Sequence, residues 1–564
     1  MNLTDWIVLL GTMLGIAAYG TWRTRHTDHL DTYLKGNRNV GWGAIGLSIM
    51  ATQASTITYL SLPGQAYESG IAFVQNYFGL PLALIFVCVF FLPIYRKLEV
   101  YTAYEYLGKR FDAKTRLLGA GLFLLQRGVQ SGITVYAPAI ILSSVLGWHL
   151  DLTIIFTGLV VIIYTVTGGS AAVTLTQKWQ MAVIFGGMVA AFVILLMELP
   201  SGALATAGAL GKLQAVDFSV DPNKRYTVWS GVLGGFFLSL SYFGTDQSQV
   251  QRYIGGAGLR EGRLGLMFNA ALKIPMQFFI VLFGALLFVH FQSQPTLPVF
   301  FNHTEWQRHA QGPQAATFHA IEQKHAGMHA AARTKIAAWT AARATGSSAA
   351  IAIAKADMLV AQQAVNDVRK EAKDALLAAN PRAKIKDSDY IFITFIMSRL
   401  PHGVIGLLLA VMFASTLSSK AGELNALAAT STIDLWRQFR PLAAHDEARN
   451  VRAAKWFTAF WGIFAIGFAL FASFAENLIE ALNIIASIFY GVLLGVFLVA
   501  FFVKRVAGTA VFFSAIAAQV LVIVMYFSLN IGYLWYNVIG CAACILFSLI
   551  LQAMLGSQRP ARVE

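Results

Sequence analysis

Six polar side chains crowd the middle of a segment that is otherwise apolar and long enough to cross a lipid bilayer. The segment runs from Gly41 to Gly70, and its polar members are Ser48, Thr52, Gln53, Ser55, Thr56 and Thr58. Polar groups at membrane depth are tolerated where they are buried in protein or line a cavity. We interpret the segment, which also contains Pro63-Gly64, as a broken helix whose freed carbonyl groups can bind a small cation. The alternative is that the hydroxyl groups bond to their own helix, or that small residues permit close packing.

The composition is that of a protein with many membrane spans. Of the 564 residues, 57% are hydrophobic and 12% are charged, whereas a soluble domain carries about 25% charged residues. The net charge of +14 does not indicate nucleic acid here, because the positions of the charges matter more than their sum. We expect a lipid bilayer and no nucleic acid as partner. Cys88, Cys541 and Cys544 lie in apolar runs and are interpreted as small packing residues.

Thirteen apolar runs, separated by charged or turn-rich segments, predict an all-α protein with about thirteen transmembrane helices. The runs are 6–22, 42–68, 71–95, 117–147, 152–168, 175–198, 227–247, 264–292, 401–436, 453–475, 478–503, 509–529 and 533–555.

The basic residues predict the orientation of these helices. With the N-terminus outside, the short cytoplasmic connections hold 23 of the 42 Lys and Arg residues, and the short external ones hold three. This asymmetry places the N-terminus outside and the C-terminus in the cytoplasm. Twelve more lie in one long external segment, 300–388. The last four lie within or at the edge of spans: Arg127, Lys273, Arg399 and Lys420. We expect an integral plasma-membrane protein, in bacteria the inner membrane.

The external segment 300–388 is rich in alanine and predicts two helices, 314–344 and 349–379, which fold back on each other at Thr345-Gly-Ser-Ser348. Such a hairpin could decorate the loop, cover a cavity or bind a protein partner, and decoration is the simplest of these interpretations.

Several motifs along the chain resemble the sodium:solute symporter family. They are Leu47 to Gly70, Tyr101-Thr-Ala-Tyr-Glu-Tyr-Leu107, Tyr136-Ala-Pro-Ala139, Tyr164-Thr-Val-Thr-Gly-Gly169, Asp221-Pro-Asn-Lys-Arg-Tyr-Thr-Val-Trp229, Asp246-Gln-Ser-Gln-Val-Gln-Arg252, Ser415-Thr-Leu-Ser-Ser419 and Leu424-Asn-Ala-Leu427. The motifs Tyr-Ala-Pro-Ala and Asp-Pro-x-x-Arg-Tyr-Thr-x-Trp are most similar to the branch of sodium-dependent iodide, monocarboxylate and multivitamin symporters.

The resemblance implies a LeuT-like fold, in which two inverted five-helix repeats face each other and the first core helix of the first repeat is broken. The implied repeats are 42–198 and 227–503, the second of which contains the insertion 300–388. The segments around them are an additional helix with a cytoplasmic loop in 1–41, an external loop in 199–226, and two C-terminal helices with a short cytoplasmic tail in 504–564.

The resemblance also implies one sodium site between the broken helix and the eighth core helix. Its ligands would be carbonyl groups of Ala51, Ala54 and Ser415 and hydroxyl groups of Ser418 and Ser419. Neutral oxygen atoms of this kind suit a small hard cation. Many family members have an aspartate in a Thr-Asp-x-x-Gln motif, where this chain has Gln177, so the resemblance does not extend to a second sodium there.

Lys420 directly follows the serine pair, and Glu423 lies three residues farther on, which predicts an ion pair along one helix face. The alternative is that the ammonium group replaces sodium or makes coupling depend on protons.

Candidate solute-binding residues lie on three core helices. They are Gln53, Thr56 and Thr58 on the first, Gln126, Arg127, Gln130, Ser131 and Thr134 on the third, and Ser239, Tyr242 and Phe243 on the sixth. Arg127 could clamp a carboxylate from the cavity wall, or it could be salt-bridged or snorkelling near the cytoplasmic edge. Tyr242 matches an aromatic residue that closes the cavity in sugar-carrying relatives, and could equally be a packed tyrosine.

These features predict a sodium-coupled symporter that imports a small organic solute by alternating access, with a carboxylate or vitamin-like organic acid favoured. We expect no enzymatic activity, because transport needs no hydrolysis and no Gly-x-x-x-x-Gly-Lys-[Ser/Thr] loop occurs. The alternatives are a proton-coupled or sodium-independent carrier of a sugar or other neutral solute, and a sensor with a partner-binding hairpin. The short tail after Leu555 favours transport.

Overall fold

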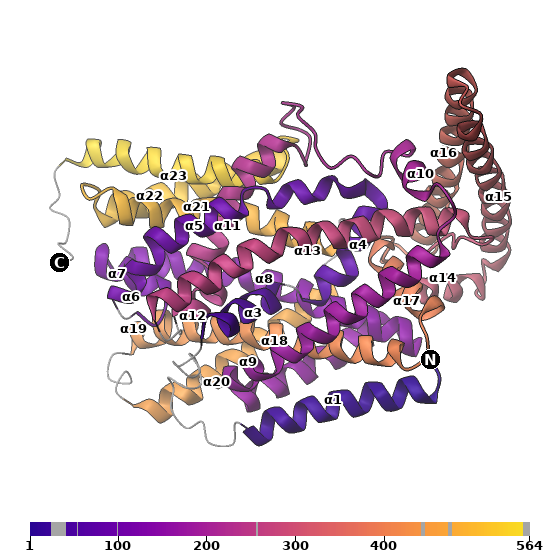
Figure 1. Cartoon of the computed structure of the whole chain (residues 1–564). Helices are drawn as coiled ribbons and strands as arrows, with labels where there is room; N and C mark the ends of the chain where they lie inside the picture. Colours follow the sequence, from indigo (N-terminus) through magenta and orange to yellow (C-terminus); the bar gives the residue numbers. More distant parts are fainter. Residues whose placement is uncertain are drawn as a thin grey trace.

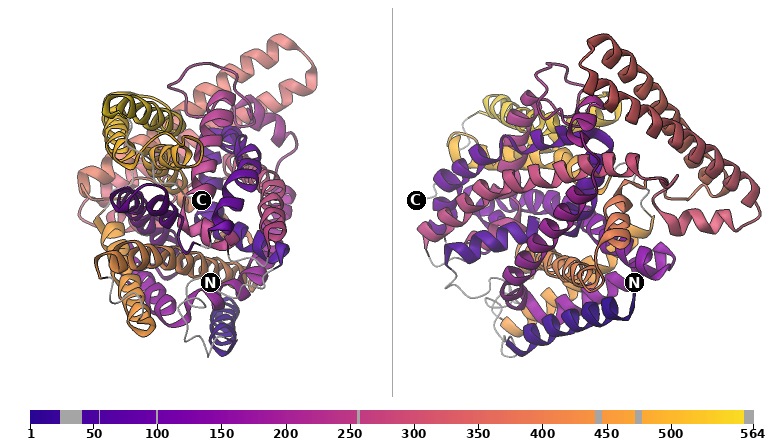
Figure 2. Two further views of the ribbon diagram at one scale, coloured as in Figure 1. Left: turned by 90° about the vertical axis from the view of Figure 1, so that its left-hand side faces the viewer. Right: turned by 45° about the vertical axis from the view of Figure 1, so that its right-hand side comes forward.

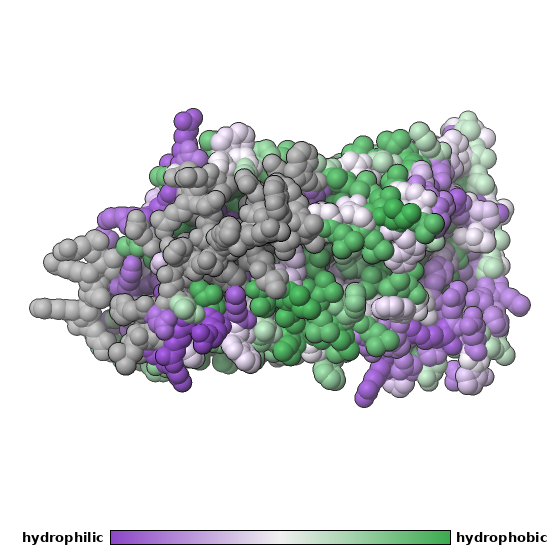
Figure 3. Space-filling view, turned by 90° about the horizontal axis from the view of Figure 1, so that it is seen from below, coloured by the Kyte–Doolittle hydropathy of each residue, from purple (hydrophilic) through white to green (hydrophobic). Residues whose placement is uncertain are grey.

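The computed structural model describes residues 1–23, 41–53, 55–98, 100–254, 258–440, 446–471 and 477–556. These residues form a bundle of helices with no β-strand among them. In Figure 1 the N-terminus lies at the end of the bundle that carries the helical hairpin of residues 315–379, and the last described part of the chain, drawn in yellow, ends at the opposite end. On the face shown in Figure 3, hydrophobic surface gathers over the middle of the bundle, between polar surface toward its two ends.

The helices of the first half are α1 (Leu3–Arg23), α3 (Trp42–Gln53), α4 (Thr56–Ser69), η1 (Gly70–Tyr77), α5 (Leu80–Phe86), η2 (Val87–Phe91), α6 (Leu92–Lys97), α7 (Ala103–Arg110), α8 (Ala113–Leu146), α9 (Leu150–Glu198), α10 (Ala203–Ala209), η3 (Ser230–Gly234), α11 (Gly235–Gly244), α12 (Gln247–Ile254) and α13 (Leu259–Ser293). The helices of the second half are α14 (His303–Ala310), α15 (Ala315–Thr345), α16 (Ser348–Ala379), η4 (Ser388–Tyr390), α17 (Ile391–Arg399), α18 (Val404–Thr430), η5 (Ser431–Trp436), α19 (Arg437–Phe439), α20 (Glu447–Phe471), α21 (Leu478–Phe502), α22 (Gly508–Ser528) and α23 (Leu534–Leu555).

Nine helical stretches in the described part of the chain are long and apolar enough to cross a membrane. Three shorter apolar helices, Leu3–Gly15, Leu150–Val166 and Ser230–Gly244, coincide with further predicted spans. The structure confirms an all-helical membrane protein, and the exact number of thirteen spans stays a prediction.

The first core helix is broken, as its polar residues predict. Helix α3 ends at Gln53 and α4 begins at Thr56, while Ser55 between them has an extended backbone with φ −74° and ψ 173°. Ala54 lies outside the described residues. The break leaves carbonyl groups at the end of α3 and N–H groups at the start of α4 without partners from their own helices.

The second half of the broken helix, α4, is packed very closely on its neighbours. A Cβ atom on Gly284 of α13 would lie 2.3 Å from the carbonyl oxygen of Pro63, and a Cβ atom on Gly64 would lie 2.0 Å from that of Ser388. Only glycine allows these backbones to approach so closely. Helix α4 is therefore fixed between α13 and the short helix η4.

Two predicted spans, 152–168 and 175–198, are joined in the single helical segment α9. Both ends of α9 lie at the end of the molecule that carries the insertion. At its start Asp151 lies near Lys384, and at its end Glu198 Oε2 lies 3.5 Å from Arg399 Nε. The chain therefore crosses the bundle twice between these ends, which accounts for both predicted spans.

The alanine-rich insertion forms the predicted helical hairpin, and Figure 2 shows it projecting from the helix bundle. Its helices α15 and α16 meet at Gly346, which has φ +72°, and the ion pairs Lys335–Asp357 and Lys324–Glu371 join them at 2.7 and 2.6 Å. The base of the hairpin is tied to the chain entering η4 through Arg369 Nη2, which lies 2.6 Å from Asp387 Oδ2.

Candidate functional site

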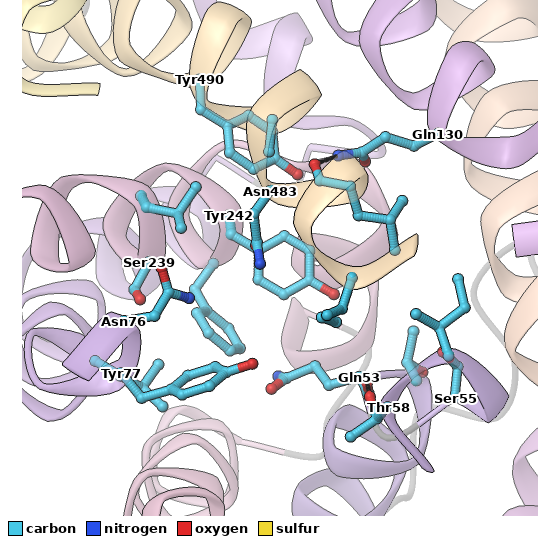
Figure 4. Close-up of a pocket in the computed structure, with 18 of the residues that line it drawn as sticks. Gln53, Ser55, Thr58, Asn76, Tyr77, Gln130, Ser239, Tyr242, Asn483 and Tyr490 are labelled. Carbon is cyan, nitrogen blue, oxygen red and sulfur yellow. Dashed lines mark hydrogen bonds between the residues drawn. The ribbon is translucent and has the colours of Figure 1, made fainter. Parts of the chain in front are cut away.

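A cavity lies beside the break in the first core helix. It contains about 880 Å³ of empty space, its open side included, and residues of α3, α4, η1, α5, α8, α11, α13, α18 and α21 line it. Most of the predicted solute-binding residues are brought together here: Gln53, Thr58, Arg127, Gln130, Thr134, Ser239, Tyr242 and Phe243. Figure 4 shows Gln53, Thr58, Ser239 and Tyr242 around this space.

Three predicted solute-binding residues do not line this cavity. Thr56 Oγ1 donates a hydrogen bond to the Met412 carbonyl oxygen at 2.6 Å, and so faces α18. Ser131 accepts hydrogen bonds from the ammonium group of Lys420. Gln126 is fully buried on α8, and neither atom of its amide group has a partner among the described residues. The periodicity of a helix fixes the direction of a side chain only approximately, and a small rotation of the helix decides whether that side chain faces the cavity.

Among the polar residues that line the cavity outside the broken helix, sequence reasoning missed six: Asn76, Tyr77, Lys273, Glu423, Asn483 and Tyr490. Lys273 had a signal, because it is one of four basic residues within or at the edge of predicted spans. Glu423 was predicted only as the partner of Lys420. Nothing in their local sequence separates Asn76, Tyr77, Asn483 and Tyr490 from ordinary packing residues.

Arg127 is 5% exposed and is held in a network of charged and phenolic groups. Its guanidinium group bonds to Asp246 and to the Tyr490 hydroxyl oxygen, the latter at 3.0 Å, and lies 3.6 Å from Glu423 Oε1. The Tyr490 hydroxyl group in turn donates to Asp246 Oδ2 at 2.6 Å. Of the two interpretations of Arg127, the structure therefore agrees with the salt-bridged arginine, although this arginine lines the cavity.

The predicted ion pair between Lys420 and Glu423 is present. Lys420 Nζ lies 3.1 Å from Glu423 Oε2 and 2.7 Å from Ser131 Oγ, and it also donates to the hydroxyl group of Thr134. Glu423 Oε2 accepts a further hydrogen bond from Thr134 Oγ1 at 3.0 Å. The buried ammonium group thus has a full set of oxygen acceptors from α8 and α18, as burial of a charge requires.

The serine pair of α18 faces the end of α3. Ser419 Oγ donates a hydrogen bond to the Thr52 carbonyl oxygen at 3.0 Å, and Ser418 Oγ donates to the Ser415 carbonyl oxygen at 3.0 Å. Ser418 Oγ also lies 3.0 Å from Gln180 Oε1. Ala51, one residue before Thr52, is 2% exposed. Ala54, the remaining predicted ligand, lies outside the described residues, and so does the side chain of Gln177.

The residues present at this place fit a sodium ion. They offer hydroxyl and carbonyl oxygen atoms at a helix break, which are the neutral ligands that a small hard cation takes. A small void lies between these elements, lined in part by Ser55, Thr56, Thr416 and Ser419. In the described part of the chain no three His, Cys, Asp or Glu side chains are grouped as ligands for a metal ion.

Known proteins resemble this chain in sequence. The human sodium/iodide cotransporter is 32% identical over 241 residues, which cover 42% of this chain and 38% of the relative. The mouse sodium-coupled monocarboxylate transporter 2 is 30% identical over 298 residues, which cover 51% and 48%. The chain thus spans less than half the length of these relatives. The sodium/sialic acid symporter SiaT of Proteus mirabilis is 25% identical over 555 residues, which cover 96% and 93%.

The fold is also found in a solved structure. A sodium-coupled sialic acid symporter in a substrate-bound, outward-open state matches 99% of both chains with a TM-score of 0.73 and 22% sequence identity. This likeness establishes the LeuT-like fold. Residues 33–294 and 358–518 match the profile of the sodium:solute symporter family. Because this match covers most of the sequence, the chain belongs to the sodium:solute symporter family.

Proposed function

We propose that the protein is a secondary active symporter that couples sodium entry to the uptake of a small organic solute by alternating access. The observation that carries this proposal is the contact of Ser419 with the Thr52 carbonyl group, which places the serine pair of α18 against the helix break. A cation bound there would hold α3 and α18 together and organise the adjacent cavity, so sodium and solute would favour the same state. These three sequence relatives are transporters by name, which supports transport over an enzymatic function.

The proposed ligands of sodium are the carbonyl groups of Ala51, Ala54 and Ser415 and the hydroxyl groups of Ser418 and Ser419. Bound sodium would supply a positive charge at the break. It would replace the hydrogen bonds that Ser418 and Ser419 donate to the carbonyl oxygens of Ser415 and Thr52. Lys420 carries a charge beside the same void. This neighbour is the observation that favours the alternative function, a carrier coupled to protons instead of sodium.

The proposed solute is an organic acid. Three relatives transport an anion by name: iodide, a monocarboxylate and sialic acid. The wall of the cavity combines the rings of Tyr77, Tyr242 and Phe243 with amide and hydroxyl groups. Such a wall suits a partly apolar molecule with one polar end.

The proposed arrangement in the membrane has the N-terminus and the hairpin outside and the C-terminus in the cytoplasm, in a bacterial inner membrane. Its support is the excess of basic residues in the short connections that the sequence predicts to be cytoplasmic. The division into inverted repeats at 42–198 and 227–503 and a protein partner for the hairpin stay predictions.

The experiment that tests the proposed function measures the apparent melting temperature of the purified protein with sodium and with potassium. A ligand that binds only the folded state raises this temperature. We expect sodium, and not potassium, to stabilise the wild type, and the double variant Ser418→Ala/Ser419→Ala to lose this shift. The matched control is Ser548→Ala, which removes a buried serine bonded within α23 to the Cys544 carbonyl oxygen at 2.7 Å.

A sodium shift that persists in the double variant would exclude the proposed site. Equal shifts with sodium and potassium would show an ionic-strength effect and reject sodium coupling. Stabilisation by lower pH without any response to sodium would favour the proton-coupled alternative.

A further inference from the structure

Lys273 is a buried basic residue in the wall of the cavity. It lies on α13, it is 3% exposed, and its side chain lines the cavity. Its Nζ atom lies 5.7 Å from the centroid of the Tyr77 ring. Among the described residues, no carboxylate oxygen lies within 4.0 Å of this atom and no acceptor receives a hydrogen bond from it. Lys273 thus differs from the other buried basic residues around the cavity.

The other charges around the cavity are already engaged. Arg127 is paired with Asp246, and Lys420 is paired with Glu423. Arg252, half-buried on α12, donates to Ser48 Oγ at 2.7 Å and to the Ser248 carbonyl oxygen at 3.2 Å. Arg252 therefore bonds to neutral oxygen atoms, and it does not line the cavity. Because Arg127 and Lys420 each have a carboxylate partner, Lys273 is the basic residue of the cavity wall that lacks a counter-ion among the described residues.

An unpaired charge at membrane depth is unfavourable, and such residues persist where they take part in function. Contact with the face of the Tyr77 ring offsets part of this cost, since an aromatic ring attracts a cation. An uncharged side chain such as methionine would fill the same space on α13 without that cost. A purely structural role therefore does not explain a lysine at position 273.

Further hydrogen-bond donors in the cavity lack acceptors. Neither Gln53 Nε2 nor Asn483 Nδ2 has a partner within the described part of the chain. Both side chains line the cavity, and Figure 4 shows their amide groups and the Tyr77 hydroxyl group pointing into it. Buried donors without acceptors are costly, so a ligand rich in acceptor oxygen atoms would complement them.

We propose that Lys273 is the residue that binds the anionic group of the solute, and that the solute is a monocarboxylate. Its carboxylate group would pair with the Lys273 ammonium group and accept hydrogen bonds from Gln53 and Asn483. Its uncharged body would pack against the rings of Tyr77, Tyr242 and Phe243, which line the same cavity. This assignment rests on the proposed function, and it replaces Arg127 as the carboxylate anchor because Asp246 already occupies that guanidinium group.

The test uses two pairs of probes, each a monocarboxylate and its uncharged amide: benzoate with benzamide, and propionate with propionamide. Their effect on the apparent melting temperature of the full-length purified protein is measured in sodium buffer and in choline buffer. We expect a carboxylate to stabilise the wild type, and its amide to have no effect. Lys273→Gln should bind that carboxylate at least about tenfold more weakly, as loss of a charged hydrogen bond predicts.

Two further variants keep the test decisive. Lys273→Arg retains the charge and should keep part of the carboxylate response. Lys273→Met removes an unpaired buried charge and should raise the melting temperature of the protein without solute. The matched control is Lys355→Gln, which removes one positive charge from the exposed surface of the hairpin helix α16 and should respond to carboxylates as the wild type does.

Three results would overturn the proposal: a carboxylate response that survives in Lys273→Gln, equal responses to carboxylate and amide, or no response of the wild type to either carboxylate. A lower melting temperature of Lys273→Met without solute would also overturn it, because it would show a structural role. The sodium shift measured without solute tests the proposed function separately. If sodium does not stabilise the wild type but a carboxylate does, sodium coupling is rejected and the proposed role of Lys273 is retained.

Discussion

Ser419 Oγ donates a hydrogen bond to the carbonyl oxygen of Thr52 at 3.0 Å, although the two residues are 367 positions apart in the chain. The contact joins the middle of α18 to the last turn of α3, directly before the break. Ser418, its neighbour, instead bonds to the Ser415 carbonyl oxygen of its own helix and to Gln180. Ser419 therefore links α18 to α3, whereas Ser418 bonds within α18 and to α9.

This difference predicts unequal effects of single substitutions. Ser419→Ala removes a proposed sodium ligand together with the link to α3, so we expect sodium binding to weaken by about tenfold or more, or roughly 1.5–3 kcal/mol. Ser418→Ala should weaken sodium binding while leaving the α3–α18 contact in place. Sodium titrations followed by melting temperature measure both, with Ser419→Thr as the control that keeps the hydroxyl group. A Ser419→Ala variant with unchanged sodium affinity would remove this residue from the site.

The network of Arg127, Asp246 and Tyr490 predicts strong non-additivity. Removal of one member of a buried ion pair leaves an uncompensated charge, which costs about 3–5 kcal/mol. We therefore expect Asp246→Asn and Arg127→Gln to destabilise the protein strongly on their own, and the double variant to be less destabilised than the sum of the two. The melting temperatures of the wild type, the two single variants and the double variant form a double-mutant cycle, which measures the interaction between the two residues.

Tyr490→Phe serves as the control in this series, because it removes one hydroxyl group and leaves the ion pair in place. Its expected cost is about 1 kcal/mol. If the two charge-removing substitutions were additive, Arg127 and Asp246 would not act as a pair, and Arg127 would again be a candidate for binding the solute carboxylate.

The features that could be predicted from the sequence depend on neighbours in the chain. The break at Ser55 follows from six polar residues in one apolar run, and the hairpin follows from alanine content with a turn at Gly346. The ion pair of Lys420 and Glu423 follows from a spacing of three residues on one helix. Local composition and helical periodicity suffice for each of these, because the physical cause lies within one element.

The remaining features depend on tertiary packing. Asp246 pairs with Arg127 across 119 residues of sequence, and no pattern in either segment indicates the other. Lys273 could be recognised as a charge within a span, but its lack of a partner depends on where every nearby carboxylate lies. Gln126 and Ser131 belong to the predicted set yet lie outside the cavity, because a small rotation of α8 decides which side chains face it.

The position of Lys420 predicts how the protein responds to protons. Glu423, Ser131 and Thr134 hold its ammonium group directly beside the proposed sodium ligand Ser419. If coupling is to sodium alone, sodium affinity should be constant between about pH 6 and about pH 8. Lys420→Gln should destabilise the protein, and Lys420→Gln/Glu423→Gln should restore part of the loss. Sodium titrations at several pH values measure the first effect. A tenfold gain in sodium affinity per pH unit that disappears in Lys420→Gln would instead show competition between a proton and sodium.

Asp389 predicts a pH dependence of stability at the end of the molecule that carries the hairpin. It lies in η4, outside the candidate membrane spans, and is 4% exposed. The amide of Asn477 donates to Asp389 Oδ1 at 2.7 Å and to the Ser61 carbonyl oxygen at 2.9 Å, so it joins η4 to α4, the second half of the broken helix. Burial raises the pKa of Asp389 to about 7, against the opposing effects of Ser61 and Lys386.

Because the folded-state pKa exceeds the unfolded value of 3.8, the folded protein binds more protons than the unfolded one between these pH values. The stabilising contribution of protonated Asp389 is therefore complete below about pH 4 and is lost as the pH rises through about 7. Asp389→Asn keeps the acceptor for Asn477 and mimics the protonated acid. We expect this variant to melt at a higher temperature than the wild type above about pH 7, and the two curves to converge toward acid pH.

The measurement is the difference in apparent melting temperature between wild type and Asp389→Asn from about pH 4 to about pH 8, which cancels the contribution of all other titrating groups. Asp367→Asn, on the exposed side of the hairpin, is the matched control and should follow the wild type throughout. Parallel curves for wild type and Asp389→Asn would mean that Asp389 is ionised in the folded protein over this whole range. Its contact with Asn477 would then be a charged hydrogen bond that stabilises the closed packing of η4 on α4 at every pH tested.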